Sequence, residues 1–461
     1  MFGAGGGTSS YREIEDTDLI ILWGSNARET HPIFFHHVLK ATRHGARLFV
    51  IDPRRTESAK LADRWLGLDV GADIALANGI AREIIASGLV NTRFVESATT
   101  GYDAFAASVS EWTLDHTASV TGVPAALIAE LAHDYARADR AQLCWTLGIT
   151  EHHNAVDNVL ALINLALLCG HVGRYGSGLN PLRGQNNVQG GGDMGAIPNR
   201  LPGFTDILDD EGRARCERAW GVTIPARYGM HLSQMFEAMG RGELRALYVL
   251  GENPAQSEAD AGRAVSLLRG LDHLVVQDIF LTRTAELADV VLPAAAAWCE
   301  AEGTVTNSER RVQRVRRALT PPGQAREDAA ILVEFARRLG ADWTYRGAEA
   351  LWDELRSVSP MHAGMTYARL EELGGIQWPC YREDAIEPPF LHGRLWAAEP
   401  AERGRLAPFS VVRHDPPVDV LDDEYPRPAV EGGGCSGKRG HEYQGWIICR
   451  KMPSTFPTLS M

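Results

Sequence analysis

DLIILWGSN, residues 18–26, is the stretch of the chain that decides the fold. Residues 18–23 (DLIILW) are expected to form a strand, because continuous rather than alternating apolar residues are typical of a strand buried on both faces of a parallel sheet. Residues 32–42 then have the pattern of a helix, and residues 47–51 (RLFVI) form a second apolar run that ends on Asp52. Strands that alternate with helices at this spacing predict an α/β fold with right-handed crossovers.

The same alternation continues toward residue 170. A third strand is expected at residues 64–68, helices at 73–88 and 124–138, and a further strand at 143–148. Residues 159–169 (VLALINLALLC) form the most apolar run of the chain. As a helix this run rises about 16 Å, which is too short for a bilayer core of about 30 Å, so we expect a buried core helix there.

An internal repeat relates the first part of the chain to a later part. Residues 232–240 read as a helix and residues 247–250 (LYVL) as a strand, and they open a second α/β unit. Each copy carries a glycine, an asparagine two residues later and two aspartates: Gly24, Asn26, Asp52 and Asp63 in the first copy, and Gly251, Asn253, Asp278 and Asp289 in the second. The glycine and the first aspartate are 28 residues apart in one copy and 27 in the other, and the two aspartates are 11 apart in both.

These residue types suit a nucleotide. In open α/β sheets, ligands lie beyond the carboxyl ends of the strands, where a glycine lets the backbone approach a phosphate and an aspartate accepts from ribose or base. Neither copy contains GxGxxG, so the standard dinucleotide fingerprint is absent. The alternative is that the asparagines and aspartates only make turns and helix caps. Because the whole set is repeated, we favour a large two-part nucleotide cofactor.

Composition limits the remaining possibilities. A chain of 461 residues predicts two to four domains. The net charge of −13 argues against a nucleic-acid partner or an anionic membrane surface. Seven cysteines without a CxxC pair provide neither a zinc ribbon nor an iron–sulfur cluster, and they suit a reducing compartment. We therefore expect a cytoplasmic protein, with export as the alternative because the first residues resemble the interior of a domain.

Two further segments differ in composition from the rest of the chain. Residues 170–203 are rich in Gly, Asn, Gln and Pro, and so long an irregular stretch predicts a functional loop. A basic run with strand-like alternation predicts a solvated hairpin face, with contact to an acidic partner subunit as the alternative; it comprises Arg310, Arg311, Arg314, Arg316 and Arg317.

The functional loop contains residues 180–190 (NPLRGQNNVQG), followed by Asp193-Met194-Gly195. This run resembles the molybdopterin-guanine-dinucleotide oxidoreductases, and among them the formate dehydrogenase alpha (catalytic) subunits. Matching segments occur in family order up to about residue 425: WGSN at 23–26, His31-Pro32, IDPR at 51–54, GENP at 251–254, QDIF at 277–280, ADVVLP at 288–293 and IQWPC at 376–380.

The resemblance implies a fold and a cofactor. It implies two Rossmann-like parallel-sheet domains related by a pseudo-twofold, each binding one pterin-guanine dinucleotide of a bis-molybdopterin guanine dinucleotide with molybdenum or tungsten. The implied residues for the first dinucleotide are Gly24, Asn26, Asp52 and Arg54. Those for the second are Gly251, Glu252, Asn253, Asp278, Thr282 and Asp289.

The resemblance also implies a substrate and a reaction. Arg183 would hold formate, since a guanidinium matches a carboxylate and stays charged, and Gln185, Asn186 and Asn187 would line the pterin and substrate pocket. Formate would be oxidised to carbon dioxide, with electrons passing through iron–sulfur clusters to iron–sulfur or flavin subunits. The alternatives are another enzyme of this cofactor class, such as a nitrate reductase, and a non-catalytic subunit of an electron-transfer complex.

The family pattern implies parts that this sequence does not contain. Family members carry an N-terminal domain with a 4Fe-4S cluster, a cysteine or selenocysteine that ligates the metal, and a C-terminal β-barrel. We find no metal ligand here, because Cys144 and Cys169 lie in apolar runs and read as inert core residues. The expected domains are 1–185, 186–300 and a connecting region at 301–425, followed by an atypical, disordered tail at 426–461. A fragment of this kind is expected to be inactive by itself.

Overall fold

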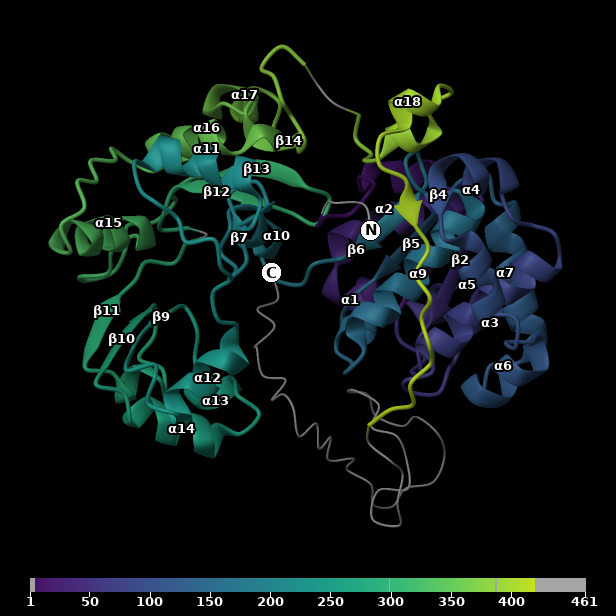
Figure 1. Ribbon diagram of the computed structural model, residues 1–461, viewed down its shortest axis with the longest axis horizontal. Coiled ribbons are helices and arrows are strands. Elements are labelled where there is room, and N and C mark those ends of the chain that lie inside the picture. Colours follow the sequence, from purple (N-terminus) through teal and green to yellow (C-terminus); the bar gives the residue numbers. More distant parts are fainter. Residues whose placement is uncertain (1–4, 298, 386–387, 419–461) are drawn as a thin grey trace. The chain divides into compact units, whose positions relative to one another are not determined.

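The chain has two compact units, which the computed structural model describes for residues 5–297, 299–385 and 388–418 (Figure 1). Within the described ranges, unit 1 comprises residues 5–189, the short segment 307–310 and residues 388–418. Unit 2 comprises residues 190–306 and 311–387. The chain therefore leaves unit 1 and returns to it twice.

Unit 1 is built on a five-stranded parallel sheet in the order β3-β2-β1-β5-β6. The strands are β1 (Leu19–Trp23), β2 (Arg47–Ile51), β3 (Arg64–Leu66), β5 (Ala141–Trp145) and β6 (Gly178–Pro181). Trp23 lies in register with Ile51 of β2 on one side and with Trp145 of β5 on the other. Strand order reverses between β1 and β5, and such a reversal is where open α/β sheets bind their ligands.

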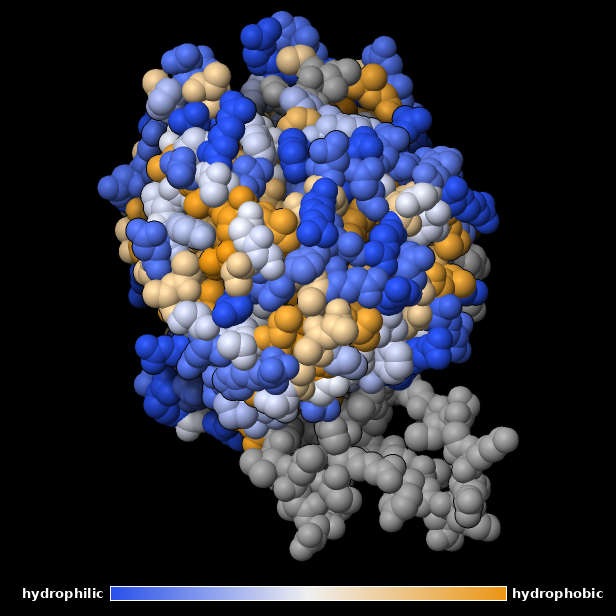
Figure 2. All heavy atoms as spheres, turned by 90° about the vertical axis from the view of Figure 1, so that its right-hand side faces the viewer, coloured by the Kyte–Doolittle hydropathy of each residue, from blue (hydrophilic) through white to orange (hydrophobic). Residues whose placement is uncertain are grey.

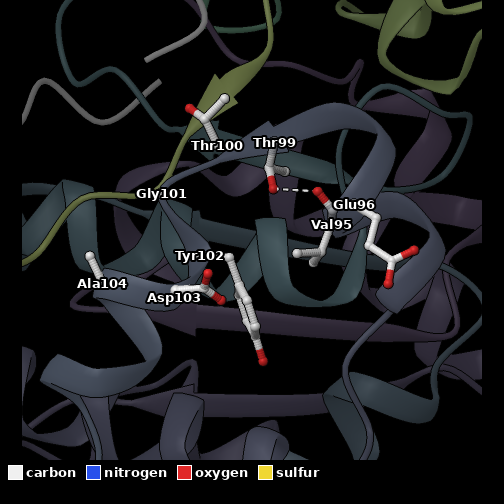
Figure 3. Close-up of a pocket in the computed structure, with 8 residues that line it drawn as sticks. All are labelled: Val95, Glu96, Thr99, Thr100, Gly101, Tyr102, Asp103 and Ala104. Carbon is white, nitrogen blue, oxygen red and sulfur yellow. Dashed lines mark hydrogen bonds between the residues drawn. The ribbon is translucent and has the colours of Figure 1, made fainter.

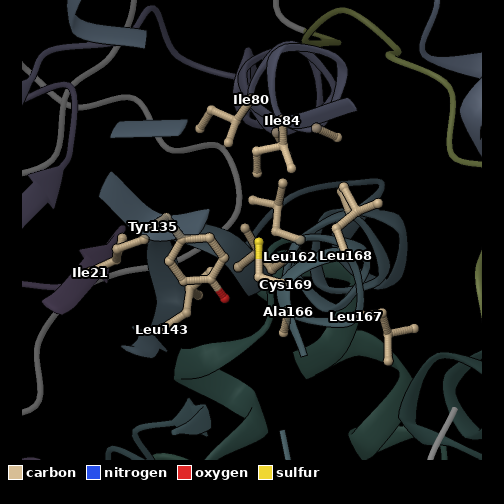
Figure 4. Packing of buried hydrophobic residues seen from close by; sticks show 14 of the residues in the cluster. Ile21, Ile80, Ile84, Tyr135, Leu143, Leu162, Ala166, Leu167, Leu168 and Cys169 are labelled. Atoms are coloured by element: carbon tan, nitrogen blue, oxygen red, sulfur yellow. The ribbon is translucent and has the colours of Figure 1, made fainter. Parts of the chain in front are cut away.

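Both faces of this sheet are buried, which explains the continuous apolar character of β1. Ile21 and Trp23 pack into a large core with α3, α7 and α9, while Ile20 and Leu22 pack on the opposite face against α2. Figure 4 shows the larger core, with Ile80 and Ile84 of α3 near residues of α9. The main helices are α2 (Pro32–Arg43), α3 (Asp73–Ala86), α7 (Ala125–Arg137) and α9 (Ala155–Cys169).

Shorter elements complete unit 1. They are α1 (Ala27–Thr30), η1 (Arg12–Asp16), η2 (Ala59–Leu61), α4 (Thr92–Ala98), β4 (Thr99–Thr100), α5 (Tyr102–Ser108), α6 (Leu114–Thr121), α8 (Leu147–Thr150), η5 (Gly393–Trp396), α18 (Pro400–Arg403) and β15 (Ala407–Pro408). β15 pairs with β4 in parallel, so a segment late in the chain is attached to the first part of unit 1.

Unit 2 contains a three-stranded parallel sheet in the order β11-β10-β9 and an antiparallel sheet in the order β12-β13-β14. Its strands are β9 (Ala246–Leu250), β10 (His273–Asp278), β11 (Val290–Pro293), β12 (Gly303–Thr306), β13 (Arg311–Val315) and β14 (Ile376–Gln377), with a small pair β7 (Arg200–Leu201) and β8 (Thr205–Asp206). Its helices are α11 (Asp210–Trp220), α12 (Leu232–Gly240), α13 (Pro254–Ser257), α14 (Ala261–Arg269), η3 (Ala285–Leu287), α15 (Asp328–Arg338), α16 (Ala348–Val358), η4 (Pro360–His362) and α17 (Tyr367–Glu372).

The predicted parallel α/β architecture is confirmed in both units. Two local expectations were wrong. The strand expected at 143–148 ends at Trp145, and Leu147 opens α8. The segment 170–203, expected to be irregular, contributes β6 and α10 (Val188–Asp193). β6 forms without an apolar pattern because its backbone pairs with β5, from Gly178 opposite Gln142 to Pro181 opposite Trp145.

The basic run at 310–317 is only partly a solvated face. Arg316 and Arg317 are exposed as expected. Arg310, however, is fully buried in unit 1 and has a φ of +67°. Its Nε donates to the Gly7 carbonyl at 2.6 Å and a terminal nitrogen donates to the Pro389 carbonyl at 2.5 Å. Irregular backbone in this region needs donors, and the arginine supplies them.

Two further observations concern the hydropathy of the surface and the lengths of the helices. Figure 2 shows hydrophobic residues interspersed among hydrophilic ones on the face that it presents. Within the described ranges, every helix is too short or too polar to cross a membrane.

The atypical tail expected at 426–461 lies outside the described residues. The domain boundaries expected near residues 185 and 300 stay predictions.

Candidate functional site

Gly24 lies at the point where the strand order of unit 1 reverses. It has a φ of +56°, and its N–H donates to the Ile51 carbonyl at 2.8 Å. A Cβ on Gly24 would lie 2.7 Å from the carbonyl carbon of Gly148, and a Cβ on Gly148 would lie 2.6 Å from the Gly24 Cα. Thr146 Oγ1 also donates to the Gly24 carbonyl at 2.6 Å. The backbones beyond β1 and β5 therefore approach each other so closely that both positions require glycine.

Asn26 and Asp52 fix the loops at the same edge of the sheet, whereas Asp63, which precedes β3, lies at the opposite, amino edge. Asn26 Oδ1 accepts from the Ser58 N–H at 3.3 Å and from its hydroxyl at 3.1 Å. Asp52 Oδ1 accepts from the Arg54 N–H at 2.8 Å, which closes a turn after β2. Asp63 Oδ2 accepts from the N–H of Leu48, the second residue of β2, also at 2.8 Å.

The second copy repeats these bonds in unit 2. Asn253 Oδ1 accepts from the Thr284 N–H at 3.1 Å and from its hydroxyl at 2.8 Å. Asp278 Oδ1 accepts from the Phe280 N–H at 2.9 Å, and Asp289 Oδ2 accepts from the Leu274 N–H at 2.7 Å. The repeat found in the sequence is thus a repeat of hydrogen bonds, atom for atom.

Sequence reasoning missed three members of this repeated set. Ser58 and Thr284 hold the asparagines, and Thr56 is the counterpart of the predicted residue Thr282. Thr56 Oγ1 accepts from the Ala59 N–H at 3.2 Å, and Thr282 Oγ1 accepts from the Ala285 N–H at 3.1 Å. Thr56 was detectable, because it follows its aspartate by four residues, as Thr282 does.

The turn-and-cap alternative for these residues receives direct support. Asn26 and Asn253 open short helices with their carbonyls, which accept from Glu29 at 3.0 Å and from Gln256 at 2.9 Å. Asp52 and Asp278 make turns through one carboxylate oxygen. A turn bond through one oxygen is compatible with ligand binding through the other, so a direct role toward a nucleotide stays a prediction.

The two copies differ in their surroundings. A Cβ added to Gly251 would meet no described atom within 4 Å, whereas one added to Gly24 would collide with backbone. Gly251 and Glu252 are exposed, and the Glu252 carboxylate accepts from the Ser257 hydroxyl at 2.7 Å. In the first copy Asp52 and Arg54 are half-buried.

Arg183 follows β6 and so lies at the carboxyl edge of the unit 1 sheet. Its N–H donates to the Ser308 hydroxyl at 2.8 Å, its Nε donates to Gln189 Oε1 at 3.2 Å, and a terminal nitrogen donates to the Gly5 carbonyl at 2.9 Å. His31 Nε2 lies 2.7 Å from the Arg183 carbonyl oxygen. The half-buried arginine is thus anchored through both its backbone and its guanidinium.

The residues after Arg183 lie at the surface. Gln185 and Asn186 are exposed, and Asn187 is half-buried with a φ of +62°. Left-handed backbone is uncommon outside glycine, although asparagine tolerates it better than most residues. The turn that contains these three residues leads directly into α10.

Trp23, the last residue of β1, forms a buried hydrogen-bonded pair with Asp73. Trp23 Nε1 donates to Asp73 Oδ1 at 2.8 Å, and burial raises the pKa of Asp73. His152 Nε2 lies 4.0 Å from Asp73 Oδ2 and 2.9 Å from the Gly148 carbonyl. The His152 ring thus bonds the backbone of α8. The sequence offered no signal for Asp73.

The donor set at this edge fits a nucleotide. Ser25 Oγ is buried and has no hydrogen-bond partner among the residues that the structure describes. Gly24 and the start of α1 adjoin Ser25 in the chain, and Asp52 and Arg54 follow the neighbouring strand β2 at the same edge of the sheet. Backbone amides, a hydroxyl and a cation suit phosphate, and a carboxylate suits the hydroxyls of ribose or the N–H groups of a base.

The cysteines of the described region offer no such fit to a metal. Cys144 and Cys169 are buried, as expected for core residues, and burial raises the pKa of the Cys144 thiol to about 12. In the parts of the chain that the structure describes, no three His, Cys, Asp or Glu side chains are grouped to hold a metal ion.

A separate cavity of about 490 Å³ lies elsewhere in unit 1 (Figure 3). It is formed by residues 95–96 and 99–104, from the end of α4 through β4 to the start of α5. No site residue predicted from the sequence lines it. The cavity is therefore separate from the residues at the carboxyl edge of the sheet.

The sequence of the chain is similar to those of known proteins. The chain is 40% identical over 92% of its length to the F420-dependent formate dehydrogenase 2 subunit alpha of Methanococcus maripaludis, covering 62% of that protein. It is 40% identical, with the same coverages of 92% and 62%, to the F420-dependent formate dehydrogenase subunit alpha of Methanocaldococcus jannaschii. It is 38% identical over 92% of its length to formate dehydrogenase H of Escherichia coli, covering 59% of it. The chain thus spans less than two thirds of the length of these relatives.

A solved structure supports the fold. The acetylene hydratase from Pelobacter acetylenicus superposes with a TM-score of 0.63 at 23% identity, over 81% of this chain and 52% of that one. The sequence profile of molybdopterin oxidoreductases matches residues 4–338. The resemblance inferred from residues 180–190 is confirmed: the chain belongs to the molybdopterin oxidoreductase family.

Proposed function

We propose that this chain forms the nucleotide-binding part of a formate dehydrogenase catalytic subunit, with Arg183 as the residue that binds formate. The observation that carries the proposal is the position of Arg183: it follows β6 in the same unit, and at the same edge of the same sheet, as the first nucleotide module. The relatives named above, which are formate dehydrogenases, give further support.

The cofactor would be bound through the repeated modules. In unit 1, Gly24 and the start of α1 would face phosphate, Asp52 would accept from ribose or base, and Arg54 would add positive charge. In unit 2, the corresponding residues would be Gly251, Glu252, Asn253, Asp278 and Thr282. Asp289 precedes β11 and bonds the Leu274 N–H at the amino edge of the sheet, so it would support the module from the other end of the strands. Each module would bind one of two pterin-guanine dinucleotides. The two modules would be related by a pseudo-twofold. When bound, the molybdenum or tungsten cofactor supplies the two-electron redox chemistry.

Arg183 would orient the substrate. Formate gives carbon dioxide, one proton and two electrons, so a negative carboxylate becomes a neutral product. The guanidinium stays charged and matches the carboxylate in shape. It would hold formate firmly and carbon dioxide weakly. The exposed Gln185 and Asn186, together with Asn187, would line the pocket beside it.

The electrons would leave to partner subunits. We propose iron–sulfur or flavin subunits as acceptors, with a 4Fe-4S cluster ligated outside this chain, and a cytoplasmic complex. Because the chain spans less than two thirds of the length of its relatives, the activity is proposed for the holoenzyme that contains it, and the 461-residue chain alone is expected to be inactive.

Arg183→Ala in the cofactor-loaded holoenzyme tests the proposal. Loss of the cation that holds and orients the carboxylate should lower kcat/KM for formate by about a hundredfold or more. Arg183→Lys keeps the charge without the planar fork and should recover only part of the activity. Arg316→Ala, at an exposed position, is the control. Metal and guanine contents must equal those of the wild type, and wild-type formate oxidation by Arg183→Ala would reject the assignment. Nitrate reduction, measured in parallel, tests the alternative enzyme class.

A further inference from the structure

His31 joins the first nucleotide module to Arg183. It lies between α1 and α2, at the N-cap of α2 and directly before Pro32. Its ring makes two contacts: Nε2 lies 2.7 Å from the Arg183 carbonyl oxygen, and Nδ1 lies 2.8 Å from Thr30 Oγ1. All of these residues belong to unit 1.

The chemistry of the partners fixes the state of the ring. A carbonyl oxygen only accepts, so the hydrogen must lie on Nε2. Burial lowers the pKa of His31, which favours a neutral ring. In a neutral imidazole the other nitrogen is an acceptor, so Nδ1 accepts from the Thr30 hydroxyl. The ring is therefore held from both sides in a single orientation.

The contact extends back to the nucleotide module. Thr30 Oγ1 also lies 3.1 Å from the Asn26 carbonyl oxygen, and the Thr30 N–H donates to that carbonyl at the same distance. Asn26 is in turn held by Ser58 through its side chain. A continuous series of bonds runs from Asn26 through Thr30 and His31 to Arg183.

The second copy of the repeat provides an internal comparison. Ser257 occupies the position of Thr30, and its hydroxyl donates to the Asn253 carbonyl at 3.2 Å, whereas Thr30 Oγ1 lies 3.1 Å from the Asn26 carbonyl oxygen and gives its hydrogen to His31. The position of His31, however, holds Glu258. The hydroxyl thus belongs to both modules, whereas the imidazole belongs only to the module that shares its unit with Arg183. A general role in shaping the module would not need the histidine.

From these contacts we infer that His31 is a positioning residue for Arg183, which it orients by donating from Nε2 to the arginine carbonyl while Thr30 fixes the ring. The inference rests on the proposed function for its catalytic consequence, because Arg183 is the proposed substrate-binding residue. The contact itself concerns only this chain, and it is measurable without the cofactor.

Three substitutions separate this role from simple packing. Glutamine places its amide N–H near the position of Nε2, asparagine is too short to do so, and alanine has no donor. In the 461-residue chain, the rate at which phenylglyoxal modifies Arg183 is measured by peptide mass spectrometry. We expect His31→Ala and His31→Asn to speed the modification several-fold, and His31→Gln to match the wild type. In the holoenzyme, kcat/KM for formate should fall about tenfold for alanine and asparagine and recover with glutamine, since a buried carbonyl loses its donor.

A double substitution shows whether His31 acts through Arg183. If it does, His31→Ala lowers kcat/KM much less in an Arg183→Ala background than in the wild type. Should His31→Ala fail to fold, long-range ¹⁵N–¹H correlations of ¹⁵N-histidine in the unaltered chain report the tautomer, with His31→Gln assigning the signal. An Nε2–H tautomer is expected, and an Nδ1–H tautomer overturns the inference.

The remaining outcomes are distinct. Equal phenylglyoxal rates in the wild type and His31→Ala overturn the inference, as does a His31→Gln variant as impaired as alanine. Normal formate oxidation by Arg183→Ala rejects the proposed function instead, and the modification and tautomer experiments then still decide whether His31 positions Arg183.

Discussion

The side chain of Asn26 is held by Ser58, whose N–H and hydroxyl both donate to its Oδ1. These bonds attach the loop after β1 to the segment before η2. Asn253 is held in the same way by Thr284 in unit 2. The asparagines therefore shape the ends of the strands, and any contact that they make with a nucleotide would come in addition to this structural role.

Asn26→Ala should destabilise unit 1 by about 1–2 kcal/mol, because it leaves a backbone N–H and a hydroxyl of the buried Ser58 without their acceptor. Hydrogen exchange with mass spectrometry should show faster exchange at the Ser58 amide, and chemical denaturation gives the free-energy change. Asn253→Ala is the matched control: it should leave the Ser58 amide protected and expose that of Thr284. Unchanged protection at Ser58 in Asn26→Ala would contradict the assigned role.

Gly24→Ala and Gly251→Ala should differ sharply, although both glycines have a positive φ. Alanine pays about 1–2 kcal/mol in left-handed backbone at either position. At Gly24 the new Cβ also meets the Gly148 backbone at 2.7 Å, whereas at Gly251 it meets no described atom within 4 Å. We expect Gly251→Ala to fold with a modest loss of stability and Gly24→Ala to lose several kcal/mol or fail to accumulate. Equal midpoints in urea denaturation would show that the close approach of β1 and β5 is relaxed in solution.

The sequence predicts well those features that depend on local pattern. β1, β2 and β9 are apolar runs, and the structure places each within one residue of its expected bounds. The repeat was also visible, because glycine, asparagine and aspartate keep their spacing in both copies. A resemblance carried by residues 180–190 then identified the family.

Partners distant in the sequence could not be predicted in this way. Ser58 lies 32 residues from Asn26, and nothing distinguishes it from other serines until the chain folds. Gly148 is constrained only because the backbone of Gly24 passes beside it. Arg310 has the charge of a surface residue, but it is buried because irregular backbone at Gly7 and Pro389 needs donors. Such features depend on packing between segments that are distant in the sequence, and a local sequence pattern does not predict that packing.

Thiol labelling should separate the described cysteines by burial. Cys144 and Cys169 are fully buried or nearly so, and burial raises the pKa of both thiols, that of Cys144 to about 12. Since the thiolate is the reactive form, both should react with iodoacetamide at pH 8 at least about a hundredfold more slowly than the half-buried Cys299. Denaturant should abolish the difference. Rapid labelling of Cys144 in the native chain would contradict its position in the core and would reopen the question of a metal-ligating role.

His171 should make the stability of unit 1 depend on pH. Its Nε2 donates to the Tyr135 carbonyl at 2.8 Å, Arg174 donates to its Nδ1 at 3.2 Å, and burial lowers its pKa to about 4. In the unfolded chain the pKa is about 6.5, so below that pH only the unfolded state takes up the proton. The stabilisation is complete above pH 6.5 and is lost as the pH falls toward 4, with about 1.4 kcal/mol gone at pH 5.5. His171→Gln keeps a donor for Tyr135 but cannot titrate, so its unfolding free energy should fall less between pH 7.5 and 5.5. Parallel pH profiles for the two proteins would show that His171 is protonated in the folded state.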